Sequence, residues 1–336
     1  MFRHKINRWI NQIWYSQTPL KKRYYPLLTF STLYRVLFCL DQLRSATHFS
    51  VPIIVVGNIT VGGTGKTPLI AWLADFLQKQ GFKPGIVSRG YGSKSIKYPH
   101  TIRENNIATE VGDEALMLFF QTQCPVVIDP NRVRAVNKLL DDFNCNIILS
   151  DDGLQHKSLG RHLEIIVIDG ERRFGNGHCL PLGPLREPVK RLKRADFIIC
   201  NGVAHDGEFQ MELQGGHLIQ LTSQKSISIS EIQNKKIHAA AGIGNPERFF
   251  LQLEKNDLQI TRHVFPDHYK YKTHDFKFLA TDEIVLMTEK DAVKCRLFAD
   301  DRFFYFPVKA QLPSAFIEKF SDSLNSILKV SNLVDN

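Results

Sequence analysis

The sequence predicts an α/β fold built on a doubly wound, mostly parallel sheet. From residue 51 onward, short apolar runs alternate with segments of helical periodicity, which is typical of parallel strands covered on both faces. The chain has 336 residues, 43% of them hydrophobic, so it can form one large domain or two of medium size. Strands of the core are expected at 51–56, 85–88, 125–128, 146–149, 163–168 and 196–200.

A smaller second α/β domain is expected after this core. We place the core at 49–205 and interpret the polar residues 206–235 as a linker. Residues 236–330 are expected to form the second domain, with helices that start near Pro246 and Asp291. Its strands are expected at 238–241, 283–287 and 302–306.

Residues 1–48 are expected to form a membrane-associating, amphipathic helical segment. Between residues 1 and 50, eight lysines and arginines stand against one aspartate, so most of the net charge of +9 lies here. Aromatic and aliphatic residues at helical spacing accompany these charges, a pattern that suits a helix in an anionic membrane interface. The same pattern would suit a helix packed on the body of the protein with a solvated basic face. The apolar run at 27–40 contains Arg35 and is too short to span a membrane.

A glycine-rich stretch, TVGGTGKTP at 60–68, lies between the first expected strand and a helix expected at 66–80. Its glycines allow backbone N–H groups to surround phosphate oxygens at the start of a helix, where the helix dipole favours an anion. Lys66 would reach the β- and γ-phosphates of a nucleotide, and the Thr67 hydroxyl would hold Mg²⁺. Thr60 stands where the common pattern has glycine, and the run resembles the variant phosphate loop of nitrogenase-iron-protein-like NTPases. The expected nucleotide-binding residues are Thr60, Val61, Gly62, Gly63, Thr64, Gly65, Lys66 and Thr67.

Two aspartates, Asp151 and Asp152, follow the apolar run at 146–149. A phosphate loop needs a carboxylate that orients the metal ion, at the end of a neighbouring strand. These aspartates are therefore expected to contact Mg²⁺, directly or through water. A simple Asp-Asp-Gly turn is the alternative, and the spacing leaves open which aspartate contacts the ion.

Phosphoryl transfer to an alcohol also benefits from a base close to the acceptor hydroxyl. Asp113 opens an expected helix in VGDE (111–114), and His268 follows Asp267 in FPDH (265–268). A helix cap would explain Asp113 equally well, and an ordinary surface histidine would explain His268. The residues alone therefore leave the identity of the base open.

Eight short motifs follow one another in order along the chain. They are GNITVGGTGKTP (57–68), SRGYG (88–92), VGDEA (111–115), DDGLQH (151–156), LPLGPLREP (180–188), AAGIGNPERFF (240–250), FPDH (265–268) and MTEKDAVK (287–294). Together they closely resemble the tetraacyldisaccharide 4′-kinases, the lipid A 4′-kinases of Gram-negative bacteria, and the match runs from about residue 14 to residue 310. The resemblance implies a P-loop NTPase-like core. It also implies transfer of the γ-phosphate of ATP to the 4′-hydroxyl of a tetraacyl glucosamine disaccharide 1-phosphate in lipid A biosynthesis.

The same resemblance implies partners and a location. The co-substrate is ATP with Mg²⁺ as cofactor, and the acceptor is an acylated disaccharide 1-phosphate lipid. The protein is expected to be peripheral, at the cytoplasmic face of the inner membrane, and to contact the membrane surface but no nucleic acid. Six cysteines without a C-x-x-C pair agree with reduced thiols in the cytoplasm.

The resemblance further implies roles for individual residues. Asp113 becomes the base for the 4′-hydroxyl, with His268 beside it and Asp267 orienting His268. If Asp113 and His268 come from different units, the site lies in the cleft between them, and we expect closure around ATP. A solvated helix face would equally explain the arginines among the candidates below. Candidate Mg²⁺ ligands are Thr67, Asp151, Asp152 and Glu187. Candidate contacts to substrate or phosphate are Arg132, Arg134, Gln155, His156 and Arg186.

A membrane-associated P-loop ATPase switch that controls partner binding is the alternative function, because relatives of this phosphate loop include such proteins. Those switches commonly dimerise through a lysine just before the two glycines, and this position is Val61 here. Dependence of phosphate transfer on a lipid acceptor would distinguish the two functions.

Overall fold

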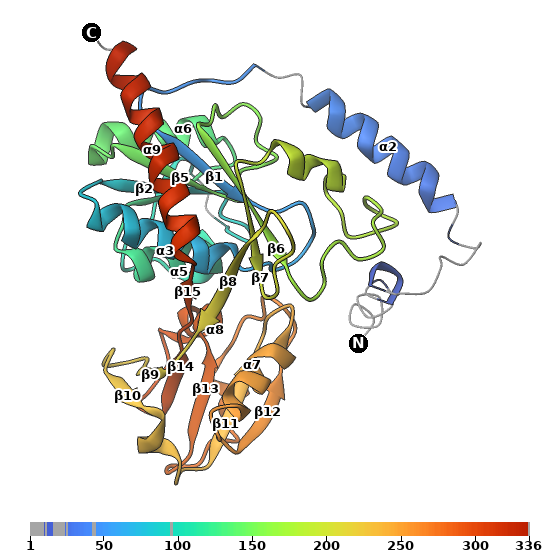
Figure 1. Ribbon diagram of the computed structural model, residues 1–336. Coiled ribbons are helices and arrows are strands. Elements are labelled where there is room, and N and C mark those ends of the chain that lie inside the picture. Colours follow the sequence, from blue (N-terminus) through green and yellow to red (C-terminus); the bar gives the residue numbers. More distant parts are fainter. Residues whose placement is uncertain are drawn as a thin grey trace.

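The computed structural model describes residues 10, 12–15, 24, 26–41, 45–94 and 97–334. Most of the basic residues near the N-terminus lie outside these described residues, whereas the apolar and aromatic residues Ile10, Ile13, Trp14 and Tyr15 lie within them. Within them, the strands form one sheet of nine strands and one of six (Figure 1). The prediction of an α/β fold with a second, smaller sheet is confirmed.

The larger sheet has the strand order β15-β8-β7-β6-β1-β5-β2-β4-β3. Its seven central strands are parallel, and each of the two edge strands runs antiparallel to its neighbour. The parallel strands are β1 (Ile53–Gly57), β2 (Pro84–Ser88), β4 (Val126–Ile128), β5 (Ile147–Asp151), β6 (Leu163–Asp169), β7 (Phe197–Asn201) and β8 (Phe209–Gln214). The edge strands are β3 (His100–Thr101) and β15 (Lys309–Gln311). The six strands predicted for the core are all present.

Helices cover both faces of this sheet, as its continuous apolar strands require. Ile54 and Val56 of β1 face the helices α3 (Lys66–Lys79), α5 (Asp113–Thr122) and α9 (Ser314–Val334). Ile53 and Val55, which point to the opposite face, pack with α6 (Arg132–Phe143) and the 3₁₀ helix η2 (Val189–Arg194). A short helix, α4 (Ala108–Val111), precedes α5.

The smaller sheet has the order β10-β9-β14-β13-β11-β12. Its four strands from β11 to β14 are parallel, while β9 and β10 are antiparallel to their neighbours. The strands are β9 (His217–Gln220), β10 (Ser226–Ser228), β11 (Ile237–Ala241), β12 (Ile260–Val264), β13 (Ile284–Thr288) and β14 (Phe303–Phe306). The helical elements are η3 (Ile229–Ile232), α7 (Pro246–Glu254), η4 (Thr273–Phe276) and α8 (Glu289–Cys295).

The expected boundaries between the units need correction. Within 206–235, interpreted as a linker, β8 pairs with β7 of the larger sheet, and β9 and β10 belong to the smaller one. Within 236–330, β15 and α9 return to the larger sheet. The polar composition that suggested a linker arises because β8 is a partly exposed strand, in which Met211 is buried between the exposed Gln210 and Glu212.

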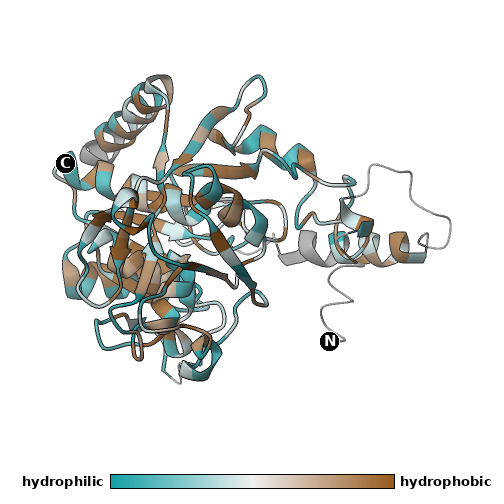
Figure 2. Cartoon of the chain, turned by 90° about the horizontal axis from the view of Figure 1, so that it is seen from below, coloured by the Kyte–Doolittle hydropathy of each residue, from teal (hydrophilic) through white to brown (hydrophobic). Residues whose placement is uncertain are grey.

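Helix α2 (Pro26–Asp41) lies apart from both sheets in two perpendicular views (Figures 1 and 2). Ser31 Oγ donates a hydrogen bond to the carbonyl of Leu180, at 3.0 Å, and thereby holds one side of the helix on the loop after β6. Leu28, Phe30 and Leu33 are 39%, 59% and 53% exposed. Among the described helices, none combines the length and the apolar composition needed to cross a membrane.

Candidate active site

The predicted phosphate loop lies at the carboxyl edge of the larger sheet, between β1 and α3. Gly62 and Gly65 have φ angles of 106° and 99°, which favour glycine. A Cβ added at Gly62 or Gly63 would meet no atom of the described chain within 4 Å, so the backbone here borders open space. The hydroxyl of Thr64 is buried and, among the described residues, has no hydrogen-bond partner. The carbonyls of Gly62 and Thr64 are already hydrogen-bonded, to Asn58 and Asn201, but the accessible glycine backbone and the Thr64 hydroxyl remain available to a ligand.

Thr60 and Val61 belong to a different contact. The Val61 N–H donates to the carbonyl of Pro184 at 2.8 Å, and Thr60 forms a β-bridge with Leu185. The N–H of Val61 is thus already paired, and the open loop begins at Gly62. Thr60 is buried in this bridge, which gives a structural reason for its departure from the common pattern.

Lys66 and Asp152 form the centre of the cluster behind the loop. The Lys66 ammonium lies 3.5 Å from Asp152 Oδ1 and 3.3 Å from Asn58 Oδ1. Arg186 also pairs with Asp152, at 2.8 Å. Burial favours the neutral acid, but the charges of Lys66 and Arg186 outweigh it and lower the pKa of Asp152 to about 2. Asp152 is therefore a carboxylate with two cationic partners.

Asp151 has a contrasting environment. It is 2% exposed; its Oδ2 accepts a hydrogen bond from Ser88 Oγ at 2.9 Å, and its Oδ1 has no partner among the described residues. Burial, together with the negative charges of Glu114 and Asp152, raises its pKa to about 6. A buried carboxylate oxygen that lacks a donor fits a hard cation such as Mg²⁺.

The other candidate Mg²⁺ ligands differ in how free they are. Glu187 is 3% exposed and is occupied by Gln155 Nε2, at 2.8 Å, and by Arg191 Nε, at 3.3 Å. Thr67 follows Lys66 in the first turn of α3. No three His, Cys, Asp or Glu side chains of the described residues form a metal-binding group. A Mg²⁺ ion held by one or two carboxylates and by phosphate oxygens requires no such group.

Asp113 and His268, far apart in sequence, lie in direct contact. Asp113 is the first residue of α5, on the larger sheet, and His268 follows β12 of the smaller sheet. Their Oδ2 and Nδ1 atoms are 2.9 Å apart. His268 has a φ of 58°, and its backbone N–H donates to Asp267 Oδ1 at 3.0 Å. The expected pairing of these residues across the two units is thus present in the geometry.

Two lysines of α8 surround this pair. Lys290 Nζ lies 3.0 Å from Glu114 Oε1 and 3.5 Å from His268 Nε2, and Lys294 Nζ lies 4.0 Å from Asp113 Oδ2. Burial alone would raise the pKa of Asp113, but the hydrogen bond from His268 and the charges of Lys294 and Lys290 lower it. Lys290 and Lys66 both lower the pKa of Glu114 against the effect of its burial. The charge of Lys66 thus acts on Glu114, which lies next to Asp113 in the first turn of α5.

The candidate substrate contacts divide into buried and exposed groups. Arg132 is 0% exposed and donates to the backbone carbonyls of Asp129, at 2.7 Å, and Asp151, at 3.1 Å. It therefore supports the end of β5 from inside and does not lie on a solvated helix face. Arg134, with its side chain 54% exposed, pairs with Asp129 at 2.9 Å.

Three further candidates lie around Asp152 and β5. Arg186 contacts Asp152, and Gln155 Nε2 also approaches the Asn58 carbonyl, at 3.4 Å. Burial and the charge of Arg132 lower the pKa of His156 to about 4, so it is neutral at pH 7.

Asn58, Ser88 and Asn201 are site residues that the sequence analysis did not assign. Asn58 and Ser88 lie in or next to the motifs GNIT and SRGYG, at the ends of β1 and β2. Asn201, the last residue of β7, donates to the Thr64 carbonyl at 3.1 Å and accepts from Arg248 of α7 at 2.8 Å. All three polar residues lie at or next to the carboxyl end of an expected strand, and these ends meet at one edge of a parallel sheet. This position in the sequence could have identified them.

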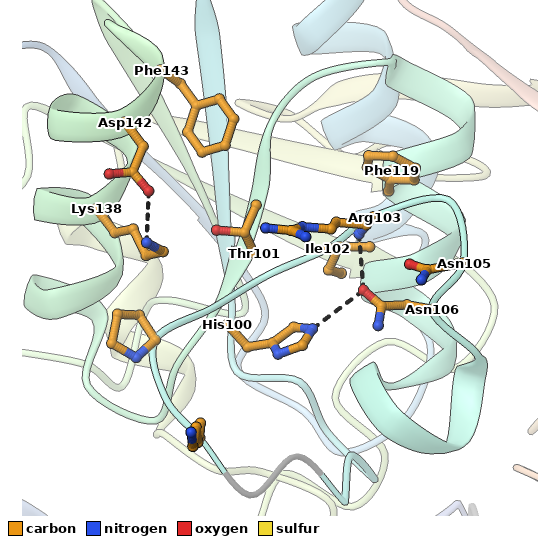
Figure 3. Close-up of a pocket in the computed structure, with 12 residues that line it drawn as sticks. His100, Thr101, Ile102, Arg103, Asn105, Asn106, Phe119, Lys138, Asp142 and Phe143 are labelled. Atoms are coloured by element: carbon orange, nitrogen blue, oxygen red, sulfur yellow. Dashed lines mark hydrogen bonds and ion pairs between the residues drawn. The ribbon is translucent and has the colours of Figure 1, made fainter.

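A cavity of about 680 Å³ lies elsewhere, at the β3 edge of the larger sheet (Figure 3). It is bordered by Phe119 of α5 and by Lys138 and Phe143 of α6. His100 and Arg103 line its floor, and His100 Nε2 lies 3.2 Å from Asn106 Oδ1. No residue of the predicted site lines it, so it is separate from the phosphate loop.

A parallel sheet with a glycine-rich loop after its first sequential strand, and with a lysine and aspartates at the same edge, defines a P-loop NTPase-like protein. A family model described as Tetraacyldisaccharide-1-P 4′-kinase matches residues 24–325. The chain belongs to this family of kinases, as its motifs indicated.

Individual relatives agree with this assignment. The chain is 46% identical over 313 residues to the tetraacyldisaccharide 4′-kinase of Nitrosococcus oceani, covering 91% of each chain. It is 45% identical over 321 residues to that of Legionella pneumophila strain Corby, covering 93% of this chain and 96% of the relative. The crystal structure of the "apo" form of LpxK from Aquifex aeolicus in complex with ATP matches with a TM-score of 0.77 and 26% identity, over 90% of this chain and 99% of that one. The ATPase switch is not favoured.

Proposed function

We propose that the chain transfers the γ-phosphate of ATP to the 4′-hydroxyl of a tetraacyl glucosamine disaccharide 1-phosphate, with Mg²⁺, at the cytoplasmic face of the inner membrane. Family membership supports the reaction. The observation in this chain that carries the proposal is the Asp113–His268 pair, whose Oδ2 and Nδ1 atoms are 2.9 Å apart. Against the effect of burial, the charges of Lys290 and of Lys66 in the phosphate loop lower the pKa of the neighbouring Glu114. An enzyme that transfers phosphate to an alcohol needs this combination of a phosphate site and a nearby base.

The phosphate side of the reaction falls to the loop and its neighbours. The backbone from Gly62 to Gly65 binds the phosphates, and Lys66 exchanges its contact with Asp152 for phosphate oxygens. Asp151 would hold Mg²⁺ through its Oδ1, which has no partner among the described residues, and Thr67 would be a second ligand. When bound, Mg²⁺ neutralises charge on the phosphate oxygens. Arg186 stays beside Asp152 and keeps positive charge at the site.

The acceptor side falls to the Asp113–His268 pair. Asp113 takes the proton of the 4′-hydroxyl as the oxygen attacks the γ-phosphorus and the bond to the β-phosphate oxygen breaks. His268, hydrogen-bonded to Asp113, keeps the carboxylate in the ionised form that can accept this proton and holds it in place. Asp267 Oδ1 accepts a hydrogen bond from the backbone N–H of His268, and its Oδ2 lies 3.9 Å from the imidazole Nε2, so Asp267 orients the ring.

The exposed face of α2 supports a peripheral location. Leu28, Phe30 and Leu33 of α2 are exposed apolar side chains. A lipid with four acyl chains stays in the bilayer, so the kinase must approach the membrane surface. The surplus of basic residues near the N-terminus suits an anionic surface.

The test is the dependence of phosphate transfer on the acceptor. The full-length chain is incubated with γ-labelled ATP, Mg²⁺ and detergent-solubilised tetraacyl disaccharide 1-phosphate, and the label in the lipid is measured. We expect a bis-phosphorylated lipid, and no labelled lipid when the acceptor lacks the 4′-hydroxyl. ATP hydrolysis at a rate that the lipid does not change, with no labelled lipid, would contradict the proposal.

A further inference from the structure

A buried ion pair on α8 lies directly behind the Asp113–His268 pair. Asp291 Oδ1 and Lys294 Nζ are 2.6 Å apart, and their side chains are 0% and 5% exposed. Charged groups are buried this deeply only with partners, because their removal from water is costly. The position of Lys294 is therefore fixed by Asp291.

Asp291 is itself held by the smaller sheet. Its Oδ2 accepts hydrogen bonds from the Gly242 N–H, at 2.9 Å, and from Thr288 Oγ1, at 2.7 Å. A Cβ at Gly242 would lie 2.8 Å from the Tyr271 hydroxyl and 3.1 Å from Asp291 Oδ1, so the close approach of this backbone requires glycine. The Asp291 carboxylate thus has two fixed donors on Oδ2 and a fixed cation beside Oδ1.

Lys294 connects this anchor to the larger sheet. Its Nζ lies 4.0 Å from Asp113 Oδ2, which is the oxygen that contacts His268. At this distance the ammonium attracts the carboxylate without taking the place of the His268 hydrogen bond. The Lys294 ammonium also lies over the ring of Tyr271, 5.1 Å from its centroid.

We propose that Lys294, anchored by Asp291, is a positioning residue that keeps the Asp113 carboxylate ionised and oriented toward His268. This inference rests on the proposed function, because it concerns the base of the same reaction. Lys294 touches neither ATP nor the acceptor in this role and acts through Asp113. The charged groups that act on Asp113 are His268, Lys294 and Lys290. Glu114 and Asp267 belong to the same cluster through their contacts with Lys290.

The two lysines of α8 have different partners and therefore different roles. Lys290 is more exposed, at 18% of its side chain, and contacts Glu114, Asp267 and His268. Lys294 is the one that pairs with a fully buried aspartate. Removal of Lys294 leaves Asp113 buried but with one cation fewer beside it. Asp113 would then be protonated at a higher pH than in wild type.

The test is the pH profile of lipid phosphorylation in Lys294→Met and Lys294→Arg. In Lys294→Met we expect the acid limb of kcat/KM to move upward by about one pH unit, with kcat reduced and the KM for ATP within about twofold of wild type. In Lys294→Arg the acid limb should return toward the wild-type position, because the positive charge is restored. Lys319→Met is the matched control: it removes a lysine that lies over the ring of Phe209, 5.5 Å from the centroid, outside the site.

A second measurement keeps the inference testable if Lys294→Met does not fold or if turnover is absent. The Asp113 carboxyl is titrated by carbon NMR in wild type and in Lys294→Gln, which retains a polar group near Asp291. We expect the Asp113 midpoint to rise in the variant. An unshifted midpoint in a folded variant would overturn the inference. A wild-type protein that fails to phosphorylate the lipid, with the NMR shift present, would instead contradict the proposed function alone.

Discussion

Two groups of charged side chains meet in this site, and they are assembled differently. The phosphate-loop cluster, Lys66, Asp151, Asp152 and Arg186, comes from loops and strand ends of the larger sheet. The dyad cluster, Asp113, Glu114, His268, Lys290 and Lys294, needs both sheets. The first cluster exists wherever the larger sheet folds, whereas the second exists only when the two sheets are correctly placed.

The contrast is sharpest between Asp151 and Asp113. Both carboxyl groups are largely buried, yet the pKa of Asp151 is raised to about 6 and that of Asp113 is lowered. The difference follows from their neighbours, since Asp151 faces other carboxylates and Asp113 faces cations. Asp151 would thus be stabilised as a carboxylate by an added cation, while Asp113 is already ionised and can accept a proton. Burial by itself does not define the role of an acid.

Lys66→Ala should have the largest effect and should act on the phosphate side only. We expect lipid phosphorylation to fall by about 1,000-fold and ATP binding to weaken, because a cation directed at the phosphates is lost. Calorimetry with a non-hydrolysable ATP analogue measures the binding, and label transfer measures the turnover.

Asp113→Asn is the matched variant in the dyad cluster. It should reduce turnover by about 100-fold with binding of the analogue retained, because only the base is lost. Equal loss of nucleotide binding in both variants would show that the two clusters do not act separately.

Asp151→Asn should separate stability from activity. The pKa of Asp151 in the folded state lies above its unfolded value. The stability that protonated Asp151 contributes is therefore fully present below about pH 4 and is lost as the pH rises through about 6. The asparagine removes that loss, so the free energy of unfolding at pH 8 should rise by about 2 kcal/mol, with no gain at pH 3.5. Urea unfolding without nucleotide or Mg²⁺ measures this, while Mg²⁺-dependent turnover should fall. A variant that is less stable than wild type at pH 8 would argue against the raised pKa.

Arg134→Ala should have the smallest effect. Its side chain is about half exposed and pairs with Asp129 at the start of α6, so we expect the free energy of unfolding to stay close to that of wild type and turnover to change by less than about twofold. Arg132→Met, at the buried neighbour, should destabilise the protein more, because two backbone carbonyls lose their donor. A large loss of turnover in Arg134→Ala, with ATP binding weakened, would instead place this arginine on the phosphates.

The sequence predicted the six neighbouring strands from β7 to β4 of the larger sheet, because each of them is a continuous apolar run bordered by a helix pattern. The same reasoning located the phosphate loop and Asp151, which lie next to such strands. It failed at β8 and β15, where one face is exposed and polar residues interrupt the run. The contact of Asp113 with His268 spans 155 positions and depends on how two sheets pack, so spacing alone left it open. Only the family resemblance suggested it.

The two segments that connect the larger sheet with the smaller one, between β8 and β9 and between β14 and β15, lie side by side. The chain leaves the larger sheet after β8 and returns at β15, its antiparallel partner. A Cβ on Gly215 would overlap the ring of Phe306, so the backbone at Gly215 lies directly against this side chain. Two adjacent connecting segments define a single hinge axis between the sheets. Rotation about that axis would carry His268, Lys290 and Lys294 together as one rigid arm and would leave the phosphate loop where it is.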